Sequence, residues 1–151
     1  MPLITVRQAA ASDFDALLRL LDQMDESMYR GRAHAGEGDL RPLYEAILAD
    51  PDQHLFLAED GDRPVGSAHL MVLRHFGRSL PLSALVEGVI VDGEYRRGGV
   101  GAALMRAAAD AARAAGCYKL DLTSNMARAG AHRFYNRLGW KRTHFGYSLE
   151  L

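Results

Sequence analysis

Residues 87–105, EGVIVDGEYRRGGVGAALM, contain the clearest structural pattern of the chain: a run rich in β-branched residues leads through a turn with two arginines and three glycines into an alanine-rich helix. The start of a helix leaves backbone N–H groups unpaired and carries a partial positive charge. Glycines at such a turn let an anion approach the backbone, and Arg96 and Arg97 add donors suited to phosphate oxygens. The stretch therefore predicts a strand, turn and helix that together bind a phosphorylated ligand.

Two common phosphate-binding motifs compete for these residues, and neither matches. A P-loop requires a lysine and then a serine or threonine after its last glycine, whereas Gly101 is followed by two alanines. A dinucleotide fingerprint G-x-G-x-x-G that is read from Gly99 meets Leu104 at its last position. A nucleotide-binding regulatory domain stays open as an alternative, because the same turn would serve a different phosphate.

The rest of the chain alternates strand and helix patterns around this unit. Two strand patterns flank the sequence DGDRP, which predicts an antiparallel hairpin. The strand, helix and strand from residue 85 to 123 predict a parallel pair. We expect one α/β domain, residues 1–151, with a mixed sheet flanked by helices. The expected strands are 3–7, 54–59, 65–75, 82–92, 118–124 and 142–151, and the expected helices are 12–28, 40–50, 101–116 and 127–138.

Composition excludes several classes of protein. The 18 lysines and arginines against 19 acids give a net charge of -1, without the positive excess of non-specific nucleic-acid binders. The six histidines lack the close spacing of metal ligands, so no metal is expected. The single cysteine, Cys117, excludes an intramolecular disulfide and suits a reducing compartment. With no long apolar run, the sequence predicts a cytoplasmic protein without a membrane or nucleic-acid partner.

The strand before the arginine turn carries two unusual residues. Glu87 is charged inside an apolar strand, which is costly to bury unless the carboxylate has a partner or a task. Gly88 inside a strand is typical of a β-bulge or of a close backbone approach. Strict alternation assigns the side chains to two faces. One face carries Glu87, Val89 and Val91, and the other carries Val86, Gly88 and Ile90.

The sequence R-x-x-G-x-G at residues 96–101 resembles the acetyl-CoA signature of the GNAT superfamily of N-acetyltransferases, and the order of elements is similar to that fold over nearly the whole chain. The resemblance implies a mixed sheet with a splayed parallel strand pair and acetyl-CoA as the acetyl donor. It assigns the CoA pyrophosphate to the turn and the pantetheine arm to the strand before it. The implied contacts are Val89, Ile90, Val91, Arg96, Arg97, Gly98, Gly99, Val100, Gly101 and Ala102, with an amide near Val89 at the thioester oxygen.

A second resemblance covers LTSNMARAGAHRFYNRLGW, residues 122–140. By position in the family, Asn125 would bind CoA, and Tyr135 would bind there too and give a proton to the departing thiolate. Glu87 would act as the general base for an amine that is mostly ammonium near neutral pH. A structural carboxylate, paired with an arginine or with the substrate ammonium, stays open for Glu87. The tail also looks like that of the aminoalkylphosphonate N-acetyltransferases, particularly in AHRFY and THF.

The resemblance therefore implies direct acetyl transfer from acetyl-CoA to a primary amine of a small molecule, in a ternary complex. Cys117 is poorly placed for a covalent intermediate. Residues 29–39 are a candidate specificity loop, and His69 and His75 are candidates to face the acceptor. A protein or peptide acceptor, or a non-catalytic acyl-CoA sensor, is the alternative function. A homodimer is common in the family and is carried over as analogy.

Overall fold

A computed structural model describes residues 3–24, 39–77 and 79–151. The chain divides into two compact units, Met1–Asp121 and Leu122–Leu151, and each is described by itself. Residues 29–38 of the expected specificity loop lie outside the described residues. Within the described ranges, no helix has both the length and the apolar character needed to cross a bilayer.

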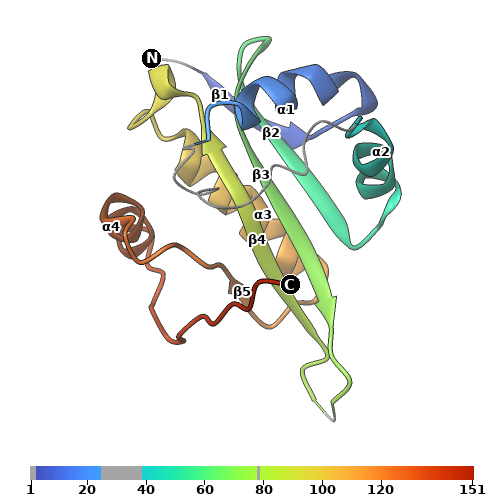
Figure 1. Cartoon of the computed structure of the whole chain (residues 1–151), viewed down its shortest axis with the longest axis vertical. Helices are drawn as coiled ribbons and strands as arrows, with labels where there is room; N and C mark the ends of the chain where they lie inside the picture. The colour runs from blue at the N-terminus through green and yellow to red at the C-terminus, as the bar shows by residue number, and fades with distance from the viewer. Residues whose placement is uncertain (1–2, 25–38, 78) are drawn as a thin grey trace. The chain divides into compact units, whose positions relative to one another are not determined.

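The first unit contains a five-stranded sheet with the order β1-β2-β3-β4-β5 (Figure 1). Neighbouring strands are antiparallel except for β4 and β5, which are parallel. The expected hairpin and the expected parallel pair are thus both confirmed. Strand β5 is shorter than the predicted strand over residues 118–124. The strands are β1 (Ile4–Gln8), β2 (Gln53–Asp60), β3 (Arg63–Arg74), β4 (Leu82–Val91) and β5 (Leu120–Asp121).

Helix α3 (Val100–Ala114) covers one face of the sheet and passes behind β3 and β4 in Figure 1. Its buried side chains include Val100 and Leu104, which lie over Gly66 of β3. A Cβ at Gly66 would come within 2.9 Å of the Val100 side chain. The close approach of the strand and the helix therefore requires a residue without a side chain at this point.

Helices α1 (Phe14–Leu21) and α2 (Arg41–Ala49) pack on the opposite face. Their apolar residues recur at helical spacing and meet inward-facing strand residues in one cluster. The short helix η1 (Ala11–Asp13) leads into α1, and η3 (Gly93–Tyr95) follows β4. The buried members of the cluster are Phe14, Leu17, Leu20, Tyr44, Leu57 and Ile90.

A β-bulge interrupts the pairing of β3 with β4. His69 lies opposite Glu87, and Ser67 lies opposite Ile90. Between these two pairs, β4 has two residues and β3 has only one. Gly88 has a φ of +57°, in the left-handed region that favours glycine, and the predicted bulge is confirmed. The extra residue reverses the alternation, and Glu87 shares a face with Ile90 instead of with Val91. The strict alternation expected from the sequence was therefore wrong beyond the bulge.

The second unit contains helix α4 (Ala129–Arg137), which ends before Gly139 as the sequence predicts. The strand expected over residues 142–151 was wrong, because these residues have no regular secondary structure. The segment has a strand-like alternation of apolar residues, with Phe145, Tyr147 and Leu149 exposed. A strand forms only where another strand accepts its backbone hydrogen bonds, and no described residue pairs with this segment in that way.

Candidate active site

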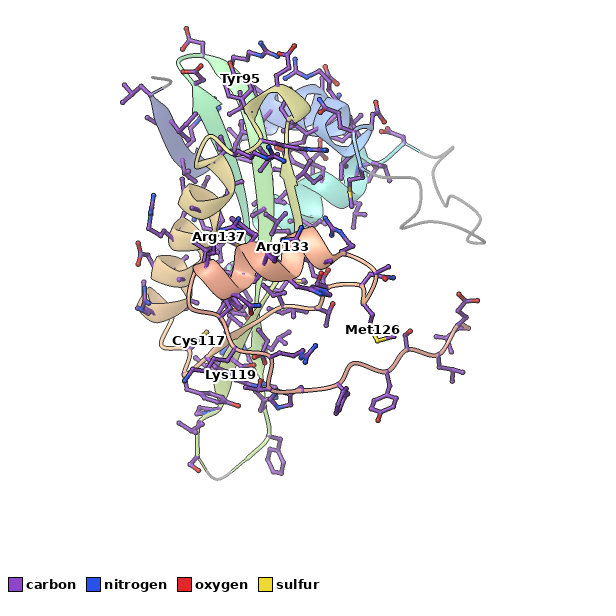
Figure 2. All side chains as sticks on the ribbon, turned by 90° about the vertical axis from the view of Figure 1, so that its left-hand side faces the viewer. Tyr95, Cys117, Lys119, Met126, Arg133 and Arg137 are labelled. Carbon is purple, nitrogen blue, oxygen red and sulfur yellow. The ribbon has the colours of Figure 1, made fainter. Side chains whose placement is uncertain are left out.

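Helix η3 is fastened to the hairpin between β2 and β3, which fixes the start of the arginine turn. The Tyr95 hydroxyl donates to the Asp60 carboxylate at 3.1 Å. The Arg63 guanidinium lies 5.2 Å from the centre of the Tyr95 ring and donates to Glu94 at 2.7 Å. Tyr95 lies at the end of the sheet where α3 begins (Figure 2). These contacts hold the turn in place, and none of them uses a backbone N–H of the turn or the guanidinium of Arg96 or Arg97.

The turn itself presents unpaired backbone donors at the start of α3. The Gly98 N–H donates to the Tyr95 carbonyl at 3.2 Å, and the Ala103 N–H donates to the Gly99 carbonyl at 3.0 Å. The other N–H groups of the predicted phosphate site donate to no described residue. They belong to Arg97, Gly99, Val100, Gly101 and Ala102. Unpaired donors grouped at the positive end of a helix form an anion site.

Arg96 and Arg97 add positive charge beside these donors. Both are exposed, and neither guanidinium forms an ion pair or hydrogen bond with a described residue. Arg97 has a φ of +68°, which is an uncommon conformation for a residue with a side chain. Strain of this kind collects at ligand sites. The residues present therefore fit a diphosphate such as that of CoA.

The edge of β4 next to this turn is open. Within the described part of the chain, β4 pairs with β5 only at Ala84 and Leu85. Beyond Leu85 no described strand of the first unit pairs with β4 on that side, so the backbone groups of the predicted pantetheine residues Val89, Ile90 and Val91 have no strand partner there. An extended ligand can add to such an edge through main-chain hydrogen bonds. The splayed pair expected from the sequence has this form.

A cavity of about 220 Å³ opens between α1, α2 and the sheet, on the face that the bulge gives to Glu87. Glu87, Gly88 and His69 line it, whereas His75 does not. The His75 ring nitrogen Nε2 lies 2.6 Å from the Ser83 hydroxyl. Of the two histidines that the sequence proposed for the acceptor site, the structure brings only His69 to this cavity.

Glu87 and His69 differ in their surroundings. Glu87 is exposed and has no hydrogen bond or ion pair with a described residue, so no described arginine is its partner. The His69 Nε2 lies 2.9 Å from the Gln53 side-chain oxygen, which accepts a hydrogen bond from the protonated nitrogen. Burial, and to a smaller extent the charge of His54, lowers the pKa of His69. Near neutral pH the ring is uncharged, and its Nδ1 is an acceptor.

In the second unit, Tyr135 belongs to an aromatic group. Its ring lies 5.1 Å from Phe134 and 6.1 Å from Trp140, centre to centre. The backbone N–H of Trp140 donates to the Tyr135 carbonyl at 3.1 Å. The Asn125 side-chain oxygen accepts from the Ala127 N–H at 2.9 Å, which forms the turn before α4. The short sequence around α4 thus fixes both predicted residues within their own unit.

The structure does not favour Cys117 as a nucleophile or a metal site among the described residues. Burial raises the pKa of the Cys117 thiol, so little thiolate forms near neutral pH. Among the described His, Cys, Asp and Glu side chains, no group of three is placed to hold a metal ion.

Two features of the site are not predicted from the sequence. Gln53 orients His69 across two strands, and the leucines of α1 and α2 form the cavity wall. The signal for Gln53 is a polar residue that begins a strand opposite the histidine strand. This signal can be used only once the register between β2 and β3 is known.

Comparison with known proteins decides the family. Residues 17–140 match the sequence model described as the acetyltransferase (GNAT) family, and this range runs from α1 through α4. The chain belongs to the GNAT acetyltransferase family. This GNAT protein is therefore an acetyl-CoA-dependent acetyltransferase, as its sequence signature predicts.

Relatives of this GNAT protein include two curated N-acetyltransferases. It is 29% identical over 151 residues to an aminoalkylphosphonate N-acetyltransferase of Salmonella typhimurium, covering 100% of this chain and 94% of the relative. It is 30% identical over 149 residues to a glucosamine 6-phosphate N-acetyltransferase of Trypanosoma brucei brucei, covering 98% and 96%. A solved structure from Bacillus halodurans C-125, described as a transcriptional regulator, has a TM-score of 0.87 at 25% identity and covers 99% of this chain and 100% of that one.

Proposed function

We propose that this GNAT protein transfers the acetyl group of acetyl-CoA to a primary amine of a small molecule, by direct attack in a ternary complex. The observation that carries the proposal is that one stretch of chain contributes to two sites. The β4 residue Glu87 lines a cavity, and the turn that follows β4 forms an anion site at the start of α3. The donor sits along the open edge of β4, and the amine enters from the cavity. The relatives named as small-molecule N-acetyltransferases support this reading.

Glu87 acts as the proton acceptor for the ammonium group of the substrate. An alkyl ammonium has a pKa of about 10.4 and is a nucleophile only after it loses a proton. The carboxylate of Glu87 lines the cavity without another described partner, which supports this role. The neutral His69 on the neighbouring strand offers a second acceptor for the same proton, directly or through water.

Tyr135 completes the reaction as the general acid. When the amine nitrogen bonds to the thioester carbon, the carbon–sulfur bond breaks, and the phenol gives its proton to the thiolate. The proton that leaves the new amide nitrogen restores the phenol. Asn125 binds the donor near the same helix. Support for both roles comes from the family signature over residues 122–140 and from the match that spans this unit.

The cavity favours a small acceptor over a peptide. Two helices and the sheet form its walls, and this enclosure suits a small molecule better than an extended peptide chain. We propose further that the two units form one catalytic domain, since the family match crosses both, and that the protein is a cytoplasmic homodimer. Light scattering on the purified chain checks the dimer.

Ligand-dependent melting tests the donor site first. A ligand that binds only the folded state raises its melting temperature by mass action. We expect acetyl-CoA and CoA to raise it and ATP and NADH to leave it unchanged. Thiol release on adding amines then tests transfer, and a non-catalytic sensor would show the melting shift without thiol release. Intersecting initial-velocity lines support the ternary complex, whereas an isolated acetyl-enzyme would contradict it.

A further inference from the structure

We propose that the cavity between α1, α2 and the sheet selects a primary amine with an apolar body, an alkylamine or arylalkylamine, over an amine that carries phosphate or phosphonate. The inference rests on the proposed acetyl transfer and names the class of its acceptor. It follows from the distribution of polar and apolar groups over the wall, from the charge of the wall and from its size.

Among the residues that the structure describes, the polar groups that face the cavity come from the strands. Ser67, His69 and Glu87 lie on β3 and β4, whereas α1 and α2 contribute leucine, isoleucine and aromatic side chains. The Tyr44 hydroxyl donates to the Ala10 carbonyl at 2.6 Å, so this residue offers the cavity its ring and not its hydroxyl. One end of the cavity therefore suits an ammonium group, and the rest suits hydrocarbon.

Charge distinguishes the acceptor classes more sharply. Glu87 is the one formally charged residue among the described residues that line the cavity, and it is negative. An ammonium group complements it, whereas a phosphonate would find no cation among the described residues of the wall to pair with it. Arg41 lies on α2, but its guanidinium sits 4.3 Å from the centre of the Phe14 ring and 3.8 Å from Asp15. It is not part of the cavity wall.

Size limits the acceptor as well. The volume of about 220 Å³ is below the range of roughly 300–1,000 Å³ that is usual for drug-sized ligands. A straight-chain or single-ring amine suits this space. Each methylene that the leucine wall removes from water contributes about 0.8 kcal/mol, which corresponds to about a fourfold gain in kcat/KM.

The test compares acceptors that share the amine and differ in the distal end. Thiol release with saturating acetyl-CoA is measured for butylamine, hexylamine, phenethylamine, 3-aminopropylphosphonate and glucosamine 6-phosphate. We expect kcat/KM to rise about fourfold per methylene from butylamine to hexylamine, and hexylamine to exceed the phosphonate by at least tenfold. Equal or higher kcat/KM for the two anionic amines would overturn the inference and leave acetyl transfer standing.

A pair of variants tests the wall directly. Leu43→Arg places a cation at an exposed leucine of the wall, and we expect it to lower kcat/KM for hexylamine and raise it for the phosphonate, each by about tenfold. Leu73→Arg on β3 lies outside the wall and is expected to change neither. Equal effects of both variants would contradict the placement. If no amine is acetylated although acetyl-CoA raises the melting temperature, the proposed function fails, and the inference fails with it.

Discussion

Glu87 and Tyr135 take opposite ends of the proposed proton path, and their substitutions separate the two roles. In Glu87→Gln the amine must arrive already neutral, so kcat/KM is expected to fall about 100-fold at pH 7. The deficit should narrow as the pH rises toward the pKa of the amine, because more of the amine is then neutral in solution. Thiol release across pH 7 to 9.5 measures this convergence.

Glu45→Gln is the matched control for Glu87. Glu45 is an exposed residue of α2 that does not line the cavity, and its variant should follow the wild-type profile. A parallel offset of Glu87→Gln at every pH would instead indicate that the carboxylate binds the substrate and does not accept its proton.

Tyr135→Phe removes one hydroxyl and keeps the ring beside Phe134 and Trp140. If the phenol protonates the departing thiolate, kcat is expected to fall by about 100-fold while the affinity for acetyl-CoA changes little. Steady-state kinetics and the melting shift with acetyl-CoA report the two quantities separately. Tyr147→Phe, at an exposed tyrosine of the same unit, is the control. Unchanged turnover in Tyr135→Phe would remove the acid role.

At the scale of elements, the β4 bulge decides which residues meet the cavity. Gly88→Ala adds a side chain where no heavy atom lies within 4 Å, so its cost is conformational and not steric. An alanine at a φ of +57° is expected to lower the free energy of unfolding by about 1 kcal/mol. Urea denaturation measures it.

Activity gives the second readout for the bulge. If Gly88→Ala flattens β4, Glu87 leaves the face of α1 and α2, and kcat/KM should fall more than the stability loss explains. Gly146→Ala is the control, because no heavy atom would crowd its new Cβ and its φ is not positive. Full activity together with full stability in Gly88→Ala would show that the bulge does not need glycine.

The elements also differ in how far the sequence predicts them. The arginine turn and α3 depend on a few consecutive residues, so the sequence alone predicts both of them. The side of the sheet on which Glu87 lies relative to Val91 depends on one extra β4 residue at the bulge. Strict alternation of side chains along the strand does not predict that extra residue. Residues 142–151 have the alternation of apolar and polar residues that is typical of a strand. This alternation indicates which side chains share a face, but it does not indicate which strand accepts the backbone hydrogen bonds. The contact of Gln53 with His69 forms only when β2 pairs with β3, and the leucine wall forms only when α1 and α2 pack on the sheet.

At the scale of the whole molecule, an ion-pair network joins β1, β2 and the entry to α1. Arg7 contacts Asp13 at 2.7 Å and Glu59 at 2.6 Å. The hydrogen bonds from Arg7 hold the pKa of Asp13 below its ordinary value, despite the opposing effect of burial. A carboxylate with a lowered folded pKa stabilises the fold fully above its unfolded pKa of about 3.9, and the stabilisation is lost as the pH falls through the folded value.

Asp13→Asn is therefore expected to lower the free energy of unfolding by about 2 kcal/mol at pH 7. The difference from wild type should shrink as the pH falls below about 3.9, because Asp13 itself then becomes neutral. Urea denaturation at pH 7 and at several lower pH values tests both statements. Asp15→Asn, at an exposed carboxylate 3.8 Å from Arg41, should cost little at any pH. A constant difference for Asp13→Asn over the whole range would contradict the ionic explanation.

The open edge of β4 has a consequence beyond catalysis. Unpaired strand edges are templates on which neighbouring chains assemble, and proteins usually blunt them with charge or cover. Here the edge next to Val89 and Val91 must stay bare, because the donor is expected to complete it. Acetyl-CoA would then also act as a solubility factor that caps the edge between turnovers. A purified stock without donor should aggregate sooner than one stored with CoA, and turbidity during storage would reveal the difference.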